Sequence, residues 1–304
     1  MDIDLDLLQD EIDSKVDSSI NMLALCRREK LCASVYLPDE KKVFVSMDLA
    51  GAEPNVMLNL TEDDMLKFFL KEAKGIAPYW NESTLMTDSM YITFASRNIV
   101  GRALINEAFE RDWNGKTFSE QYLEDSDVIK KWLDSHGKAY GMYKMLTLAL
   151  LYGLGGKGVV RQLMEYGVNL SEKQGYEIYN SFWSMFSGVD SFQKQLQKHL
   201  RVQKFLTNPL GFKLNCKPRN VLNAYIQSFV SSFISNLLIA LDEYKKAEYI
   251  ATIHDEIIFS IKEEDIPEFL EFRNDVLRQL NEAVGFKYPL ELGRVEGKNF
   301  YEAK

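Results

Sequence analysis

The chain has 304 residues, 46% of them hydrophobic, and a formal charge of −9 at pH 7. This size allows one large domain or two to three subdomains with a real core. No apolar run approaches the roughly 18 to 20 residues of a membrane span, and the acidic start of the chain is unlike a signal peptide. Three cysteines without a CxxC pair argue against a zinc site and suit a reducing cytoplasm. The net charge argues against indiscriminate binding of nucleic acid, but it allows a local basic groove.

The chain up to about residue 205 is predicted to form strands and then helices. Residues 41–48, KKVFVSMD, have the β-branched and aromatic content of a strand, and residues 29–38 form a weaker one. From about 61 to 205 the pattern is mostly helical. One helix is expected to begin with Thr61 as its cap, and another spans 137–153, GKAYGMYKMLTLALLYG, with glycine at its end.

The last part of the chain is predicted to hold a long helix followed by a hairpin. Residues 219–244 read as one helix, which runs into the two strands YIATI and IIFSI. His254, Asp255 and Glu256 lie at the bend, so the charged tip can be exposed while its arms are buried. Helices in the middle and strands at both ends favour an α+β fold whose sheet is assembled from distant parts of the chain. Such a sheet would bring Asp48 close to Asp255.

Two carboxylates at adjacent strand ends make a site of hard oxygen ligands that suits Mg²⁺. A pair of this kind could hold two ions about 3.5 to 4 Å apart, which activate an attacking oxygen and stabilise a leaving one in phosphoryl transfer. Taken alone, the HDE sequence fits a solvated hairpin turn better, because Asp is common in turns. The choice therefore depends on the other motifs.

Three motifs in chain order resemble those of the family A DNA polymerases, the group that contains bacterial polymerase I and many phage replicases. VSMDLAGAEPNVM resembles the first palm motif, KMLTLALLYG the fingers helix motif, and IHDEI the second palm motif. Arg219, Asn223 and Gln227 recur every fourth residue, as in the family's helix that contacts primer and template. The ending YPLELGRVEGKNFYEAK, with Phe300 or Tyr301 where a tryptophan is usual, extends the likeness over nearly the whole chain.

The resemblance implies a two-metal site at the ends of the palm strands. Asp48 and Asp255, with the backbone carbonyl of Leu49, would hold two Mg²⁺ ions, for which Mn²⁺ can substitute, and Glu256 would be their acidic neighbour. Such ions make the proton of a primer 3′-hydroxyl labile and neutralise the charge that grows on the phosphate. The implied activity is that of a DNA-directed DNA polymerase, adding deoxynucleotides to a primer 3′ end.

The resemblance also implies a nucleotide site on the fingers helix. Lys144 would supply a compact positive charge for the triphosphate, and an ordinary solvated lysine is the alternative. Glu53 would stand beside the sugar and block a 2′-hydroxyl, unless it is only a surface acid. The implied nucleotide-binding residues are Lys144, Glu53, Leu148, Tyr152, Tyr140 and Lys138. YGLGGKG lacks the Ser or Thr of a phosphate loop, so a helix end and a turn are the better interpretation.

The DNA contacts implied by the resemblance lie on the long helix and at the hairpin. Arg219, Asn223 and Gln227 share one helix face, where they could donate to minor-groove acceptors, although an exposed polar stripe is the alternative. His254 could contact the primer end, but a lone histidine in a turn is often structural. The expected partners are primer–template DNA and deoxynucleoside triphosphates, without a membrane. The expected location is the cytoplasm, that of the host if the chain is phage-encoded.

The implied architecture is a palm, an antiparallel sheet with helices, and an inserted, mostly helical fingers subdomain. The palm would comprise residues 1–65 and 201–304, and the fingers 66–200. Insertions near 75–88 and 105–132, which contain Tyr79, Trp80 and Trp113, are expected to contact DNA or a partner. Because 47 residues precede Asp48, we expect no thumb and no proofreading exonuclease here, and a second chain that could supply them.

Several positions depart from the family pattern. Tyr140 stands where an arginine usually grips the triphosphate, with Lys138 or His136 as substitutes, and Leu148 stands where an aromatic ring is usual. Gly51 and Asn55 replace a glutamine and an arginine of the first motif. The alternative function is therefore a degenerate polymerase that only binds DNA or a replication partner.

Two other classes of enzyme share parts of this pattern. A single-subunit RNA polymerase has the same palm, but Glu53 and Glu256 speak against it. A two-metal nuclease would use paired acids without needing the helix that carries Lys144.

Overall fold

Four strands from distant parts of the chain form one antiparallel sheet. They are β1 (Lys42–Asp48), β6 (Glu248–Ile253), β7 (Glu256–Lys262) and β8 (Val295–Gly297), in the order β6-β7-β1-β8. Since β1 lies between β7 and β8, a segment from the start of the chain pairs on both sides with segments more than two hundred positions away. The predicted mixture of helices and a sheet assembled from distant parts is confirmed.

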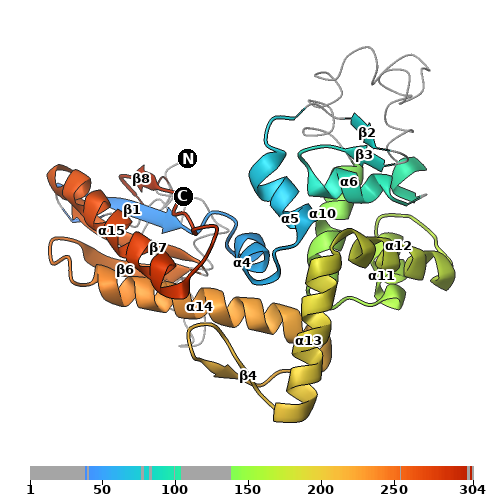
Figure 1. Cartoon of the computed structure of the whole chain (residues 1–304). Helices are drawn as coiled ribbons and strands as arrows, with labels where there is room; N and C mark the ends of the chain where they lie inside the picture. The colour runs from blue at the N-terminus through green and yellow to red at the C-terminus, as the bar shows by residue number, and fades with distance from the viewer. Residues whose placement is uncertain are drawn as a thin grey trace, which may run out of the picture. The chain divides into compact units, whose positions relative to one another are not determined.

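The structure is a computed structural model that describes residues 38–39, 41–76, 79–81, 84–98, 100–103, 138–253, 255–299 and 302. These residues divide into two units (Figure 1). The sheet unit contains the described residues up to Ala52 and those from Ser231 onward. The helical unit is Glu53–Val230. The predicted weak strand at 29–38 and the segment 105–132 lie outside the described residues, apart from the last residue of the strand.

The core of the sheet unit forms because most residues of β1 and β7 are buried on both faces, with apolar side chains in the majority. Val45 and Met47 are fully buried, and Val45 is paired with Phe259 of β7. Helix α15 (Ile266–Val284) lies against this sheet through Phe269, whose ring centroid is 5.4 Å from that of Phe259 (Figure 1). Such aromatic pairs add to the burial of apolar area in stabilising the unit.

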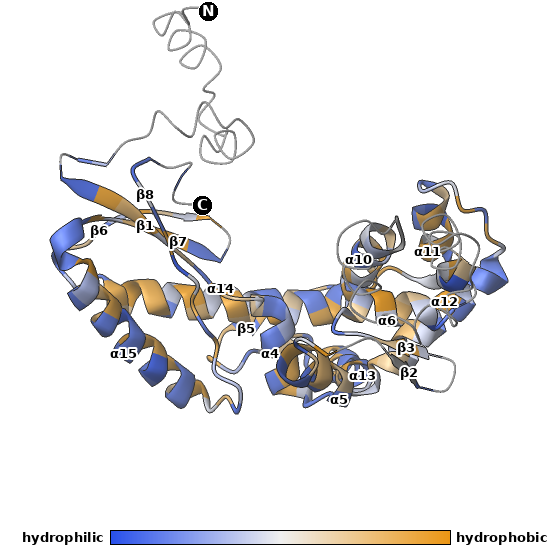
Figure 2. Ribbon diagram, turned by 90° about the horizontal axis from the view of Figure 1, so that it is seen from above, coloured by the Kyte–Doolittle hydropathy of each residue, from blue (hydrophilic) through white to orange (hydrophobic). Residues whose placement is uncertain are grey.

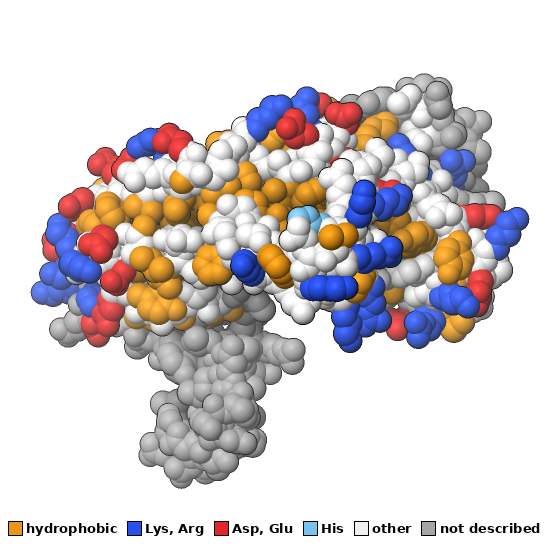
Figure 3. Space-filling model, turned by 60° about the horizontal axis from the view of Figure 1, so that its bottom comes forward, with side chains coloured by type: hydrophobic (Ala, Val, Ile, Leu, Met, Phe, Trp, Pro, Cys, Tyr) orange, Lys and Arg blue, Asp and Glu red, His pale blue; other side chains and the backbone are white. Residues whose placement is uncertain are grey.

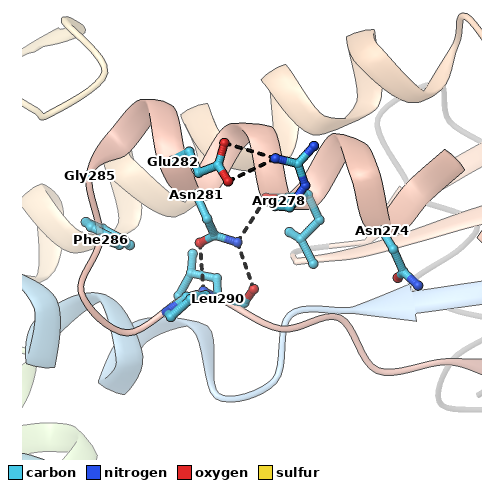
Figure 4. A pocket seen from close by; sticks show the side chains of 9 residues that line it. Asn274, Arg278, Asn281, Glu282, Gly285, Phe286 and Leu290 are labelled. Atoms are coloured by element: carbon cyan, nitrogen blue, oxygen red, sulfur yellow. Dashed lines mark hydrogen bonds and ion pairs between the residues drawn. The ribbon is translucent and has the colours of Figure 1, made fainter. Parts of the chain in front are cut away.

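The end of α15 is fixed by one buried amide. Asn281 donates to the carbonyl of Leu290 at 3.0 Å and accepts from the Leu290 N–H at 2.8 Å, so it satisfies both backbone groups of the returning segment. This segment and α15 line a hollow of about 330 Å³ (Figure 4). Arg278 and Glu282, on its wall, bond each other at 2.9 Å. The polar groups of this hollow are therefore largely engaged with one another.

Short elements begin the helical unit and longer helices complete it. The elements in chain order are α4 (Ala52–Thr61), α5 (Asp64–Lys67), a π-helix (Phe68–Glu72), β2 (Tyr79–Asn81), β3 (Thr84–Met86), α6 (Met90–Ser96), α10 (Lys138–Leu151), α11 (Gly156–Met164), α12 (Glu172–Met185), α13 (Ser187–Gln203), β4 (Leu206–Thr207), β5 (Lys213–Leu214), a 3₁₀ turn (Pro218–Asn220) and α14 (Val221–Leu241). A second 3₁₀ turn, Glu263–Asp265, precedes α15. Strand pair β2–β3 therefore interrupts the region predicted as mostly helical, and β4–β5 follows just after its end.

An aromatic cluster holds the helical unit together. The rings of Phe94 on α6, Tyr143 on α10 and Phe182 on α12 are fully buried. Phe94 contacts both of the others edge to face, with centroids 5.1 and 5.2 Å away. The Tyr143 hydroxyl donates to the Asn98 side chain, so its polar end is satisfied inside the core.

The start of the helix after α4 differs from the prediction. Thr61 is the last residue of α4 and not a cap, and its hydroxyl donates back to the Met57 carbonyl. Asp63 is the N-cap of α5, and its side chain accepts from the N–H groups of Met65 and Leu66. The sequence TEDD offers several capping residues, and the prediction of Thr61 was wrong because the preceding helix continues through it.

Helix α14 corrects the expectation about apolar runs. By length and hydropathy alone, Pro218–Leu241 could cross a membrane, since an 18-residue window has a mean hydropathy of 1.5. Half of that window is buried inside the protein. Phe229, Phe233 and Leu237 of α14 are fully buried, and the ribbon of this helix is largely hydrophobic in Figure 2. A core helix meets the same criterion. Serine and asparagine residues interrupt the apolar residues of this helix, so it contains no continuous apolar run of that length.

Candidate active site

Asp48 and Asp255 lie at neighbouring strand ends. Asp48 is the last residue of β1, and Asp255 lies in the turn just before β7. The N–H of Leu49 donates to the Asp255 carbonyl at 3.4 Å, so the two strands remain bonded to the point where the carboxylates emerge. Asp48 is exposed and Asp255 is half-buried. The predicted meeting of residues more than two hundred positions apart is therefore found in the fold.

Glu256 stands directly opposite Asp48 across the strand pair. The bond from Leu49 to Asp255 makes this a non-hydrogen-bonded pair, the type whose Cα atoms are only about 4.5 Å apart. Directly opposed residues project from the same face, so two like charges are held close together, which is unfavourable without a compensating group.

The expectation that all three charges lie on an exposed tip is wrong for Glu256. This residue belongs to β7 and is 5% exposed. The hydroxyl of Ser46, also buried, donates to its carboxylate at 2.6 Å, and a charge-assisted bond of this kind stabilises a buried acid. Ser46 was missed by the sequence analysis, although strand alternation places it on the same face as Asp48.

The donor set at this strand end fits a hydrated Mg²⁺ ion. Among the described residues no three His, Cys, Asp or Glu side chains form a metal-binding group. Mg²⁺, however, is typically held by one or two carboxylates, with water and phosphate oxygens completing its shell. Asp48 and Asp255 supply that number. The Leu49 backbone lies beside both of them, since its N–H donates to Asp255.

Helix α10 carries the predicted nucleotide residues on one face. Tyr140, Lys144 and Leu148 recur every fourth residue within Lys138–Leu151 and therefore share a face. Lys144 is exposed, whereas Tyr140 and Leu148 are half-buried. The Tyr140 ring contacts the Tyr91 ring edge to face, with centroids 5.4 Å apart. Tyr140, which stands where the resemblance would place an arginine, is thus packed against another aromatic ring.

Glu53 links the end of α10 to α14. The Tyr152 hydroxyl donates to one carboxylate oxygen at 2.9 Å, and the Gln227 amide donates to the other at 3.4 Å. Partial burial, followed by the bond to Glu53, raises the pKa of Tyr152 to about 12, so the phenol keeps its proton and remains a donor. Glu53 is therefore held in a defined position.

A small hollow lies beside this linkage. It is lined by Glu53, Met57, Leu151, Tyr152, Leu222, Asn223 and Ile226. The Asn223 side-chain oxygen is buried without a hydrogen-bond partner among the described residues. Three residues predicted for two separate functions, Glu53, Tyr152 and Asn223, are thus neighbours in one wall.

The start of α14 is fitted closely to the end of α10. Arg219 is exposed and lies in the 3₁₀ turn before α14, so only Asn223 and Gln227 of the predicted trio belong to the helix itself. Gly153 has φ of +90°, and a Cβ there would lie 2.3 Å from the Arg219 carbonyl oxygen. Only glycine suits both conditions. The helix end that was predicted at this glycine is confirmed.

The model of DNA polymerase family A matches residues 140–302, more than half of the chain. The chain belongs to DNA polymerase family A. The matched segment contains Lys144, Gln227 and Asp255, which lie in the structure as described above.

Two curated relatives align with most of the chain. DNA polymerase I of Bacillus caldotenax is 22% identical over 302 residues, covering 89% of this chain and 32% of that protein. DNA polymerase I of Caldicellulosiruptor bescii is 20% identical over 295 residues, covering 90% of this chain and 28% of that protein. The chain thus spans about a third of the length of these relatives.

A solved polymerase structure shares the fold. It is the POL domain of Pol1 from M. smegmatis in complex with DNA primer-template and dNTP. The two match with a TM-score of 0.62 at 18% identity, covering 90% of this chain and 42% of that chain. The α+β fold of a polymerase domain is therefore confirmed.

Some predicted family A residues lie outside the described part of the chain. These are His254, His136, Phe300 and Tyr301, together with the side chain of Lys138. The aromatic residues of the predicted insertions, Trp113 and the side chains of Tyr79 and Trp80, lie outside it as well. Their predicted roles stay predictions.

Proposed function

We propose that the chain is a template-directed DNA polymerase that adds deoxynucleotides to a primer 3′ end by two-metal phosphoryl transfer. Membership of family A supports the reaction class. The observation that supports the chemistry is that Asp48 and Asp255 lie at neighbouring ends of β1 and β7. The N–H of Leu49, the residue after Asp48, donates to the carbonyl of Asp255. A nuclease would have no use for the α10 face that carries Lys144.

Asp48 and Asp255, with the Leu49 carbonyl, would hold Mg²⁺ at this strand end. When bound, such ions lower the pKa of an attacking hydroxyl and neutralise charge on a phosphate. The carboxylates of Asp48 and Asp255 would orient this site, because their backbones are fixed by the strand pairing. The hydrogen bond from Ser46 would hold Glu256 in place, so that Glu256 provides a fixed negative charge beside the two aspartates.

Lys144 would bind the triphosphate and Glu53 would select the sugar. An exposed ammonium on a helix face is free to pair with phosphate oxygens as a compact charge. The bonds from Tyr152 and Gln227 hold Glu53, so its carboxylate would present a fixed obstacle to a 2′-hydroxyl. A held side chain discriminates better than a mobile one, since it does not swing away.

In this proposal the sheet unit corresponds to the palm and the helical unit to the fingers, with Arg219, Asn223, Gln227 and His254 contacting primer–template DNA. The boundaries at 65 and 201, and the insertions near 75–88 and 105–132, stay predictions. So does a second chain that supplies a thumb or an exonuclease.

The alternative is a degenerate polymerase that binds DNA or a replication partner without catalysis. One observation favours it, namely that Tyr140 packs against Tyr91 where the family has a triphosphate-binding arginine. The polymerase is preferred because both acidic residues and Lys144 remain in place. The two functions are separated by the effect of the acidic residues on activity, since a binding factor has no need of them.

Primer extension tests the proposal. A labelled primer on a longer template should be extended with Mg²⁺ or Mn²⁺, and Asp48→Ala and Asp255→Ala should each lower the rate about a thousandfold or more. Asp242→Ala, an exposed acid at the end of α14, is the matched control and should leave the rate unchanged. Absence of extension by the unaltered chain with either ion, or full activity of Asp48→Ala, would contradict catalysis.

A further inference from the structure

One arginine of helix α15 occupies a position that the helix pattern assigns to an apolar side chain. The buried positions of this helix recur at spacings of three and four residues, beginning with Ile266, Phe269, Arg273 and Val276. They therefore share the face that lies against the sheet, and Arg273 is 9% exposed there. A guanidinium keeps its charge at neutral pH, so its burial is unfavourable without a compensating group.

Arg273 has no carboxylate partner among the described residues. The other two arginines of the described sheet unit are paired, Arg278 with Glu282 and Arg294 with Glu296. Several lysines of this unit have carboxylate partners as well, and Figure 3 shows acidic and basic side chains side by side at the left, where the unit lies. The charge of Arg273 is therefore an exception within its own unit.

One neutral oxygen occupies the guanidinium fork of Arg273. The Nε and Nη2 groups both donate to the side-chain oxygen of Asn274, at 3.1 and 2.7 Å. The third nitrogen, Nη1, is buried without a hydrogen-bond partner among the described residues. Two parallel donors of this kind match the two oxygens of a carboxylate, which would form stronger, charge-assisted bonds. Asn274 is exposed, so its amide can turn to water and leave the fork to a ligand.

An apolar hollow adjoins this fork, because Asn274 is part of its wall (Figure 4). The hollow of about 330 Å³ has an apolar lining, made by Leu277, Phe286, Pro289 and Leu290. Ligand sites commonly measure about 300 to 1,000 Å³, so this one lies at the small end and suits a single large side chain. The fork and the hollow together suit a ligand with one apolar group and one negative charge.

We propose that the hollow and the Arg273 fork bind the C-terminal residue of a partner protein, an apolar residue with a free α-carboxylate. The carboxylate displaces the Asn274 oxygen and accepts from Nε and Nη2 of Arg273. The apolar side chain enters the hollow. The inference goes beyond the proposed catalysis and does not rest on it, because none of these residues is assigned to the reaction.

The charges around the fork favour one carboxylate over a polyanion. Burial, and then the positive charge of Arg294, lowers the pKa of Arg273, which places a second cation near the fork. Glu271 and Asp275 are exposed one turn apart on the same helix, and Glu271 lies three positions before Asn274. These acids repel a nucleic acid or a strongly acidic peptide. A terminal residue carries its carboxylate and its side chain on one carbon, which matches the adjacency of fork and hollow.

Peptide binding to the full chain tests the proposal. The probe is a fluorescein-labelled peptide, Gly-Ser-Gly-Ser-Gly-Phe, with a free C-terminal carboxylate, and fluorescence anisotropy measures its affinity. It should bind saturably at one site. The same peptide with a C-terminal amide should bind at least about tenfold more weakly, since its hydrogen bonds lack the charge.

Substitutions of the exposed Asn274 test the fork without disturbing the core. Asn274→Asp supplies an internal carboxylate to the fork and should weaken peptide binding at least about tenfold. Asn274→Ala removes the amide that the ligand displaces and should strengthen binding, by about threefold. Arg273→Met, which keeps a long side chain, should abolish the preference for the carboxylate over the amide peptide.

The matched control is Gln279→Glu, the same change of charge at an exposed amide of α15 that does not line the hollow. Its affinity should stay within about twofold, because an exposed charge at that distance is screened. Circular dichroism should show all variants folded, and primer extension by Asn274→Asp should equal that of the unaltered chain.

Several outcomes would overturn the proposal. They are absence of binding, equal affinity for the two peptides, equal loss in Asn274→Asp and Gln279→Glu, and weaker binding by Asn274→Ala. Tighter binding of 3-phenylpropionate than of the peptide would replace the partner protein with a small carboxylate. A chain that extends no primer would still bind the peptide, so failure of the proposed catalysis is distinguishable from failure of this site.

Discussion

The Asp63 carboxylate accepts hydrogen bonds from the backbone of Gly188, 125 positions later in the chain. The bond to the Gly188 N–H is 2.7 Å long, and a second, from the Val189 N–H, is 3.2 Å. The other carboxylate oxygen accepts from Met65 and Leu66 at the start of α5. One buried side chain therefore caps two helices, α5 and α13, and a Cβ on Gly188 would lie 2.9 Å from it.

Replacing Asp63 with Ala should cost about 2 to 4 kcal/mol of unfolding free energy, because four N–H groups lose their acceptor. Urea denaturation measures the loss. Ser171→Ala removes the exposed cap of α12 and should cost only about 1 kcal/mol. A loss at Asp63 no larger than that at Ser171 would show that the double cap has no special role.

Gly153→Ala should destabilise the chain by about 2 kcal/mol or more, since φ of +90° and the nearby Arg219 carbonyl both exclude a side chain. Gly141→Ala on the same helix α10 is the control. No atom lies within 4 Å of a Cβ there, so it should stabilise the helix by about 0.5 to 1 kcal/mol. Thermal melts of both variants should move in opposite directions.

Glu53→Ala should raise the incorporation of ribonucleotides relative to deoxynucleotides by about tenfold or more, because the obstacle to a 2′-hydroxyl is removed. Tyr152→Phe deletes the 2.9 Å bond to Glu53 and should give a smaller change in the same direction. The ratio of kcat/KM for the two sugars is the measurement. An unchanged ratio in Glu53→Ala would disprove its proposed role in selection.

Stability should fall at high pH partly through Tyr152. Folding raises the pKa of its phenol from 10.0 to about 12. The protonated phenol therefore adds to the free energy of unfolding fully below pH 10, and this stabilisation is lost as the pH rises toward 12. The effect should be small, because the side chain is partly exposed. The difference in denaturation midpoint between the unaltered chain and Tyr152→Phe should shrink over this interval. A difference that stays constant would contradict the raised pKa.

Elements with a strong pattern were predicted well from the sequence. Strands β1, β6 and β7 and helix α10 follow directly from alternation, β-branching and the terminal glycine. The adjacency of Asp48 and Asp255 followed from placing two strand ends in one sheet. These features depend on the residue types within each segment and on one strand pairing, that of β1 with β7.

The errors concern groups whose environment is set by distant residues. Glu256 looks exposed in a charged triplet, but the β1 pairing draws it into the strand, where Ser46 binds it. The capping of α13 by Asp63 was not predicted, because its donors there are the N–H groups of Gly188 and Val189, far along the chain. Neither contact has a local signal, since each partner lies more than a hundred positions away.

The main chain around Asp48 is restrained from both flanks. Its carbonyl accepts from Gly293 at 2.8 Å, the next residue donates to Asp255, and Ala50 donates to Glu291 at 2.9 Å. When Asp48 binds a ligand, only its side-chain torsions therefore become fixed, because its backbone is already ordered. The loss of conformational entropy on binding is small for this reason. Amide protons of Leu49, Ala50 and Gly293 should accordingly exchange with deuterated solvent as one slow group.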